Sequence, residues 1–221
     1  MQNFATPAPI STVVEIPAGR VQLIAADRAD TTVEVRPTNP GKPRDVQTAE
    51  QTTVTFADGV LQVRTAEPKN KLTGHAGSVE VTVQLPAGSA LDGKSDAAEL
   101  RTVGRLGDVA FDGAYQQIKI DEAASVRLTA IDGDVEVGRL TGPAEISTGR
   151  GDVRVAEATS GSVVLRTQSG DITVAAGAGV SAALDAGTGL GRVSNSLKND
   201  GTTVLDISAS TGLGDISASS L

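Results

Sequence analysis

The sequence predicts an all-β protein in which antiparallel or mixed N-terminal strands lead into a parallel β-solenoid resembling a β-helix or β-roll. Two observations carry this prediction. Short segments alternate apolar and polar residues along the chain, without an apolar stripe at helical spacing, so we predict strands and no helix. From residue 100 onward an apolar alternation, a Gly-Asp turn and a second alternation recur as a unit, which is typical of stacked coils.

The composition predicts a thin aliphatic core. Of the 221 residues 39% are hydrophobic, but only three are Phe, one is Tyr and none is Trp, so Val, Ile, Leu, Ala and Thr must fill the interior. The formal net charge of -8 argues against nucleic acid and anionic membranes, because those partners require clustered Lys and Arg. The absence of Cys excludes disulfides and thiol chemistry.

The chain divides into three parts in this interpretation. Residues 1–11 are expected to be a flexible segment, residues 12–99 a strand-rich part, and residues 100–221 solenoid repeats continuous with the preceding part as one unit. Surface loops are expected at Asn39 to Arg44 and Pro68 to Gly77. The predicted strands of the first part are Thr12 to Ile16, Val21 to Ala25, Thr31 to Arg36, Thr52 to Phe56, Val60 to Arg64 and Val79 to Leu85.

The repeats of the second part have a period near 20 residues. Gly133, Gly151 and Gly170 are 18 and 19 residues apart, and each precedes an Asp and a second alternation. The turns that end at Gly107, Gly191 and Gly214 are expected to be two residues longer. The predicted structural turn residues are Gly107, Asp108, Gly133, Asp134, Gly151, Asp152, Gly170, Asp171, Gly191, Arg192, Gly214 and Asp215.

Stacking in register predicts which outward residues are neighbours. Arg127 should lie beside Glu145, Glu136 beside Arg154, and Arg166 beside Asp185, which are all pairs of opposite charge. In the turns we expect Gly to supply a positive φ and Asp to act as an Asx-turn acceptor.

These features resemble the bacterial β-strand-repeat family of unknown function whose members are often labelled "putative adhesins". The resemblance rests on Val-Glu-Ile-Pro-Ala-Gly at residues 14–19, Val-Thr-Val-Gln-Leu-Pro-Ala-Gly-Ser at residues 81–89, and the Gly-Asp-Val or Gly-Asp-Ile repeats. It implies a β-strand-repeat fold along nearly the whole chain, and an export or membrane link for many members.

No catalytic constellation emerges from the residues, and we predict neither an enzyme nor a cofactor. A nucleophilic triad needs a base, and the single histidine, His75, lies in a glycine-flanked segment that we interpret as a solvated loop. Asp134, Asp152 and Asp171 are weak calcium candidates, since one Asp per coil supplies few of the six to eight oxygens that calcium takes. Otherwise no metal site is predicted.

Two short motifs have structural explanations. Gly187-Thr188-Gly189-Leu190-Gly191 is glycine-rich like a phosphate-binding loop, but no helix pattern follows it. Arg150-Gly151-Asp152 spells the cell-attachment tripeptide, yet its Gly-Asp belongs to the repeat.

We therefore predict a non-enzymatic β-solenoid scaffold or adhesin-like binding module. The alternatives are a self-assembling intracellular β-solenoid and, less favoured, a polysaccharide-acting β-helix enzyme, against which the lack of outward aromatic residues counts. The expected partner is a protein or a second copy bound through the C-terminal coil, because the final coil runs into Leu221 without a cap. No nucleic-acid partner or direct membrane insertion is expected. Residues 1–12 contain no leader pattern, so the location is cytoplasmic as written, or extracellular if a leader was removed.

Overall fold

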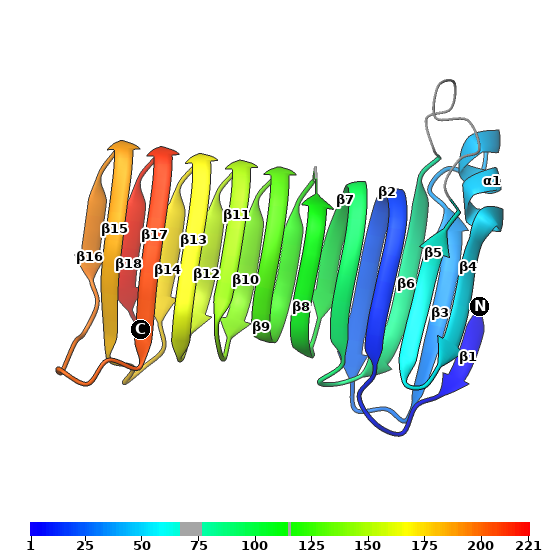
Figure 1. Cartoon of the computed structure of the whole chain (residues 1–221), viewed down its shortest axis with the longest axis horizontal. Coiled ribbons are helices and arrows are strands. Elements are labelled where there is room, and N and C mark those ends of the chain that lie inside the picture. Colours follow the sequence, from blue (N-terminus) through cyan, green and yellow to red (C-terminus); the bar gives the residue numbers. More distant parts are fainter. Residues whose placement is uncertain (67–76, 115) are drawn as a thin grey trace.

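The structure, a computed structural model, describes residues 1–66, 77–114 and 116–221. In this part of the chain 18 strands form one continuous sheet that coils around a shared hydrophobic core, so the all-β prediction is confirmed (Figure 1). The first half contains β1 (Gln2–Ala5), β2 (Ser11–Ala26), β3 (Asp30–Pro37), α1 (Pro43–Gln51), β4 (Thr52–Ala57), β5 (Val60–Thr65), β6 (Val79–Pro86) and β7 (Ala90–Val103). The second half contains β8 (Arg105–Ala114), β9 (Ile118–Asp132), β10 (Val135–Leu140), β11 (Ala144–Arg150), β12 (Val153–Ala158), β13 (Gly161–Ser169), β14 (Ile172–Ala176), β15 (Ala182–Leu190), β16 (Val193–Ser196), β17 (Leu205–Leu213) and β18 (Ile216–Ser220).

Each coil of the second half contributes one strand to each of two facing parallel layers. In the front layer of Figure 1, β8 pairs with the second half of β9, which pairs with β11, and β11 pairs with β13. In the other layer, the first half of β9 pairs with β10, followed by β12 and β14. Side chains alternate in and out along each strand, so the inward residues of both layers meet in the core.

The first half combines parallel and antiparallel pairs, as predicted. β2 is parallel to β5, β6 and β7, whereas β3 and β6, β4 and β5, and β1 and β3 are antiparallel. The two predicted strands at Thr12 to Ile16 and Val21 to Ala25 form the single strand β2. Gly19 permits this continuity, because its φ is +125° and a Cβ there would lie 1.9 Å from the Val79 carbonyl oxygen.

Helix α1 contradicts the prediction of no helix and shortens the loop expected at Asn39 to Arg44. Pro43 fills the first turn, where its missing N–H costs nothing. Asp45 is buried and accepts hydrogen bonds from the backbone N–H groups of Asn39 and Ser78. Polar contacts rather than an apolar stripe therefore anchor the helix, which is why apolar spacing did not reveal it.

Residues 1–11, expected to be flexible, contain β1, which pairs in register with β3. The hydroxyl groups of Thr6 and Thr31 are hydrogen-bonded, and Ile10 is buried in the core. The expected boundary between residues 99 and 100 falls inside β7, which pairs with β2 along nearly its whole length. The loop expected at Pro68 to Gly77 and His75 lie almost wholly outside the described residues, which resume at Gly77.

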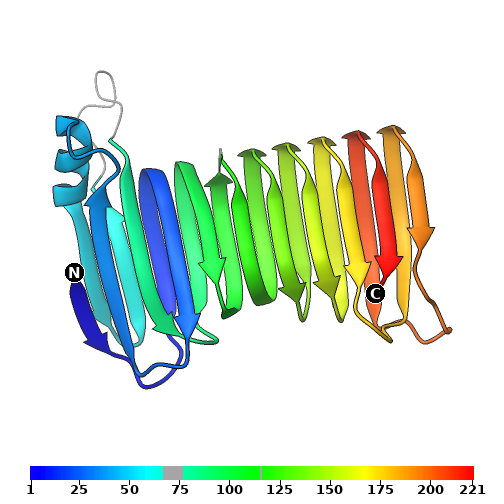
Figure 2. The ribbon, with the colours of Figure 1, turned by 180° about the vertical axis from the view of Figure 1, so that it is seen from behind.

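The last two coils are stacked out of sequence order. β17 lies between β13 and β15, and β18 lies between β14 and β16. The chain thus leaves β14, skips one position, forms β15 and β16 at the end of the stack, and returns to fill the gap (Figures 1 and 2). The prediction that the final coil is the uncovered end is wrong, because the end is formed by β15 and β16.

The connections fit this order. Residues 159–160 suffice to join β12 to β13 in the adjacent coil, whereas residues 177–181 join β14 to β15 and residues 197–204 join β16 to β17. Between β14 and β15 the skipped position requires roughly 9.6 Å of displacement instead of about 4.8 Å, so a longer link is needed there. The return link is fixed by hydrogen bonds from the Lys198 N–H to the Ser220 hydroxyl and from the Asp200 N–H to the Ser181 hydroxyl.

The polar residue Asn195 suits the outermost position of β16. Asn195 is aligned with Ala218, which is in turn aligned with Val174, so Asn195 occupies a core-facing position. Between two coils its amide would be buried at a cost of about 1–3 kcal/mol unless fully hydrogen-bonded. At the end of the stack Asn195 is exposed, and its Oδ1 accepts a hydrogen bond of 3.0 Å from the Leu197 N–H.

Candidate functional site

The Gly-Asp turns form an aspartate ladder along one corner of the stack. The Asp152 N–H donates to Asp134 Oδ1 at 2.9 Å, the Asp171 N–H to Asp152 Oδ1 at 2.7 Å, and the Asp215 N–H to Asp171 Oδ1 at 2.7 Å. The Arg192 N–H ends the ladder by donating to Asp215 Oδ1 at 2.8 Å. Each carboxylate thus accepts a hydrogen bond from the next coil, rather than from its own turn as expected for an Asx-turn.

Glycine is required before each ladder residue. Gly133, Gly151, Gly170, Gly191 and Gly214 all have positive φ values, between 120° and 158°. Their positions match in register, so the turns at Gly191 and Gly214 have the same length as the turn at Gly170, contrary to expectation.

Gly107 and Asp108 do not belong to this corner. Asp108 is aligned with Ser125, and Val109 with Leu91 and Val126, which places the pair at the opposite end of the coil. The sequence motif Gly-Asp-Val therefore occurs in two different structural settings, and motif matching alone could not separate them.

The calcium candidates and the tripeptide both lie along the corner of the aspartate ladder. No group of three or more His, Cys, Asp or Glu side chains that could hold a metal ion occurs in residues 1–66, 77–114 and 116–221. Within Arg150-Gly151-Asp152, Asp152 Oδ1 is held by the ladder and Arg150 Nε lies 3.8 Å from Asp132 Oδ2. Both charged groups thus have partners within the corner. The segment 187–191 spans the end of β15 and the turn into β16, so no helix follows it.

The predicted neighbours of opposite charge are found in two of three cases. Arg127 is aligned with Glu145, and Glu136 with Arg154. Arg166 does not meet Asp185, because β17 intervenes and aligns Asp185 with Ser208. Arg166 Nη1 instead lies 3.5 Å from Glu145 Oε1.

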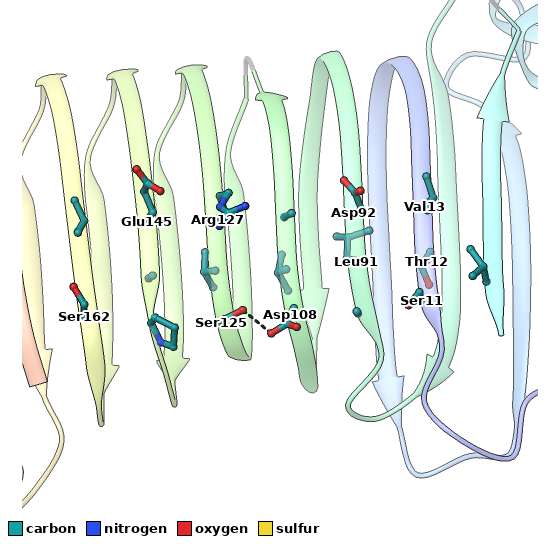
Figure 3. Close-up of a pocket in the computed structure, with 18 residues that line it drawn as sticks. Ser11, Thr12, Val13, Leu91, Asp92, Asp108, Ser125, Arg127, Glu145 and Ser162 are labelled. Atoms are coloured by element: carbon teal, nitrogen blue, oxygen red, sulfur yellow. Dashed lines mark hydrogen bonds between the residues drawn. The ribbon is translucent and has the colours of Figure 1, made fainter. Parts of the chain in front are cut away.

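A groove of about 810 Å³ crosses the outer face of one layer and is the candidate binding site (Figure 3). It runs across strands β5, β2, β7, β8, β9, β11 and β13, perpendicular to their direction. One row of lining residues is small, with one member at each successive position from β2 to β13. This row consists of Ser11, Ala90, Asp108, Ser125, Pro143 and Ser162.

A second outward row, two residues further along each strand, carries the larger charged side chains of the groove. It contains Asp92, Arg127 and Glu145 together with the smaller Val13, Ala110 and Val164. The side chains of the first row are smaller than the charged side chains beside them. The surface is therefore lower along the first row, and this depression is the groove. Ser125 Oγ donates to Asp108 Oδ1 at 2.6 Å and links two adjacent strands across its floor (Figure 3).

Two carboxylates outside the groove have lowered pKa values. The Thr202 backbone N–H and the Ser181 hydroxyl donate to Asp200 and lower the pKa of its carboxyl group. Hydrogen bonding from Arg28 lowers the pKa of Asp30. Both groups serve local structure: Asp200 lies in the return link, and Asp30 is the first residue of β3.

With its coiled parallel layers, the molecule is a β-solenoid. The chain belongs to the Toastrack DUF4097 family, whose model matches residues 11–220. A "putative adhesin" from Bacteroides fragilis is similar in fold, with a TM-score of 0.53, 13% identity, and coverage of 98% of this chain and 95% of that one. A "putative cell adhesion protein" from Clostridium sporogenes matches with a TM-score of 0.40, 12% identity, and coverage of 100% and 98%. A comparison with curated proteins finds no match.

Among the described residues, no helix has the length and apolar character needed to cross a membrane.

Proposed function

We propose that the protein is a non-enzymatic, adhesin-like binding module that holds an extended ligand in the groove. The observation that carries this proposal is the continuous row of six small residues at successive positions from β2 to β13. Strands in a sheet repeat about every 4.8 Å, so an elongated ligand along the groove meets an equivalent position at each step. The family's fold and the similarity in fold to the "putative adhesin" of Bacteroides fragilis support an adhesin-like role.

The lining favours a polysaccharide as the ligand. Ser11, Ser125 and Ser162 offer hydroxyl groups, while Asp92 and Glu145 offer carboxylate acceptors for sugar hydroxyl groups. No aromatic side chain occurs among the lining residues, so stacking on sugar rings contributes nothing. Recognition must then come from many weak hydrogen bonds, and affinity should increase with the number of sugar units.

The carboxylates of the groove support binding rather than acid–base catalysis. A general acid in a glycosidase has its pKa raised, commonly by burial in an apolar pocket. Asp92, Asp108 and Glu145 are instead exposed, and two of them already have partners, Asp108 with Ser125 and Glu145 with Arg166. This arrangement suits a binding surface.

A length series of oligosaccharides from several soluble polysaccharides tests the proposal by isothermal titration calorimetry. We expect affinity to increase with length for at least one series. The double variant Ala110→Leu with Ser125→Leu fills the groove with aliphatic volume and should abolish that binding. Thr173→Leu with Ser217→Leu is the matched control, because both residues are exposed on the other layer. Absence of binding in every series, or equal binding by the groove variant, would contradict the proposal.

A further inference from the structure

The two ends of the stack are built differently. At the N-terminal end, the antiparallel strands β1, β3 and β4 and helix α1 gather beside the first coil (Figure 2). At the other end, β15 pairs with β17 and β16 pairs with β18, and the outer edges of both strands face solvent (Figure 1). We call these two strands the open end.

Most of β15 lacks the usual protection of an edge strand, although its first N–H, that of Ala182, donates to the Lys198 carbonyl of the return link. Edge strands of soluble proteins are commonly short, bulged, or interrupted by Lys or Pro, because their free N–H and C=O groups can pair with another chain. β15 is nine residues long, contains neither Lys nor Pro, and has one charge, Asp185; β16 has no charge.

Exposed apolar side chains gather at the same end. Leu190 and Val193, on the terminal coil, are 72% and 45% exposed, and Leu213, on the adjacent coil, is 53% exposed. Leu190 and Leu213 are aligned neighbours. Covering these side chains would add a favourable hydrophobic contribution to any pairing of the edges.

The charge of this region favours a second copy of the chain as the partner. The chain has a formal net charge of -8, so copies repel one another over most of their surfaces. Residues 182–204, which form the open end and its return link, contain two acidic residues, Asp185 and Asp200, and two basic ones, Arg192 and Lys198. This region is therefore neutral and can approach its own copy without net repulsion.

We propose that two copies associate end to end about a two-fold axis, with β15 antiparallel to β15 of the second copy. Two-fold association is the commonest closed symmetry and leaves neither open end free. It replaces the expected association through the final coil, which is enclosed. The interface does not include the groove, so the test of dimerisation is independent of the test of the proposed function.

The backbone sets the register of β15. The Ser181 carbonyl accepts a hydrogen bond from the Leu205 N–H, so Ser181 directs its carbonyl toward β17. Because backbone groups alternate sides along a strand, those of Asp185 and Gly187 also face β17, and those of Ala186 face the open side. A register centred on Ala186 pairs the Ala186 backbone groups of the two copies and sets Asp185 opposite Gly187 in the non-hydrogen-bonded positions, so no like charges meet.

This register can be tested by introducing a charged side chain at Gly187. A Cβ at this position would meet no atom within 4 Å. Light scattering with size-exclusion chromatography over a wide concentration range should show the unmodified chain reaching twice its mass of 22.3 kDa. Gly187→Asp should remain monomeric, because each new carboxylate faces Asp185 of the other copy. Gly187→Lys should still dimerise, because its ammonium group faces the same carboxylate.

Ser210→Asp is the matched control, since Ser210 is aligned with Gly187 one coil inside the stack. It adds the same charge away from the edge and should dimerise like the unmodified chain. Thermal unfolding of each variant establishes that it is folded. An unmodified chain that stays monomeric at all concentrations, a species larger than a dimer, a dimeric Gly187→Asp variant, or a monomeric Gly187→Lys or Ser210→Asp variant would each overturn the proposal.

Discussion

Asn195 is aligned with Ala218 in the core-facing register, and it is exposed to solvent because no coil covers β16. The order of the last two coils therefore decides whether the Asn195 side chain is exposed or buried. A polar amide is acceptable at the end of the stack and costly one position further in, where Ala218 lies between Val174 and Asn195.

The first prediction compares the same amide at both positions. Ala218→Asn should lower the free energy of unfolding by about 1–3 kcal/mol, because it buries an amide between two coils. Asn195→Ala should change it by less than about 0.5 kcal/mol, as is usual for exposed positions. Urea unfolding of both variants measures the difference. Equal effects of the two substitutions would show that β18 is not enclosed.

The aspartate ladder gives a second prediction. Asp152→Ala removes the acceptor for the Asp171 N–H and should cost about 0.5–1.5 kcal/mol of unfolding free energy. Asp152→Asn keeps an acceptor oxygen at the same place and should retain most of the stability. Chemical denaturation distinguishes the two variants, and a larger loss for Asn than for Ala would mean that negative charge, not the hydrogen bond, matters at this corner.

A third prediction concerns Arg192, which ends the ladder beside Asp215. Arg192→Asp extends the acidic row by one residue and should lower the melting temperature at low salt, through a loss of at most about 1 kcal/mol for exposed charges. Added salt should restore part of the loss, since the Debye length falls to about 3 Å near 1 M. Arg192→Gln is the neutral control. A loss that does not respond to salt would refute charge repulsion as its cause.

Apolar alternation and the Gly-Asp repeats were enough to predict the strands, the parallel coils and two neighbouring pairs, Arg127 with Glu145 and Glu136 with Arg154. Helix α1 was missed because the buried Asp45 anchors it by hydrogen bonds. The groove was also missed, since it arises from the relative sizes of outward residues on strands far apart in sequence.

The order of the last coils depends on long-range pairing, which alternation does not encode. Two signals for it were nevertheless present in the sequence: the longer link at residues 177–181, and Asn195 at a position where the other coils carry Val, Ile or Ala.

Disulfide formation between engineered cysteines tests this coil order most directly, because the chain has no native Cys. Thr173, Ser217 and Ser194 are exposed, with Ser217 aligned with both Thr173 and Ser194. Disulfides need Cα atoms about 4.4–6.8 Å apart, which suits neighbouring strands but not strands two positions, or roughly 9.6 Å, apart. Under mild oxidation, Thr173→Cys with Ser217→Cys should form an intramolecular disulfide, detected by mass spectrometry, and Thr173→Cys with Ser194→Cys should not. The reverse result would show that the coils stack in sequence order and would contradict this account.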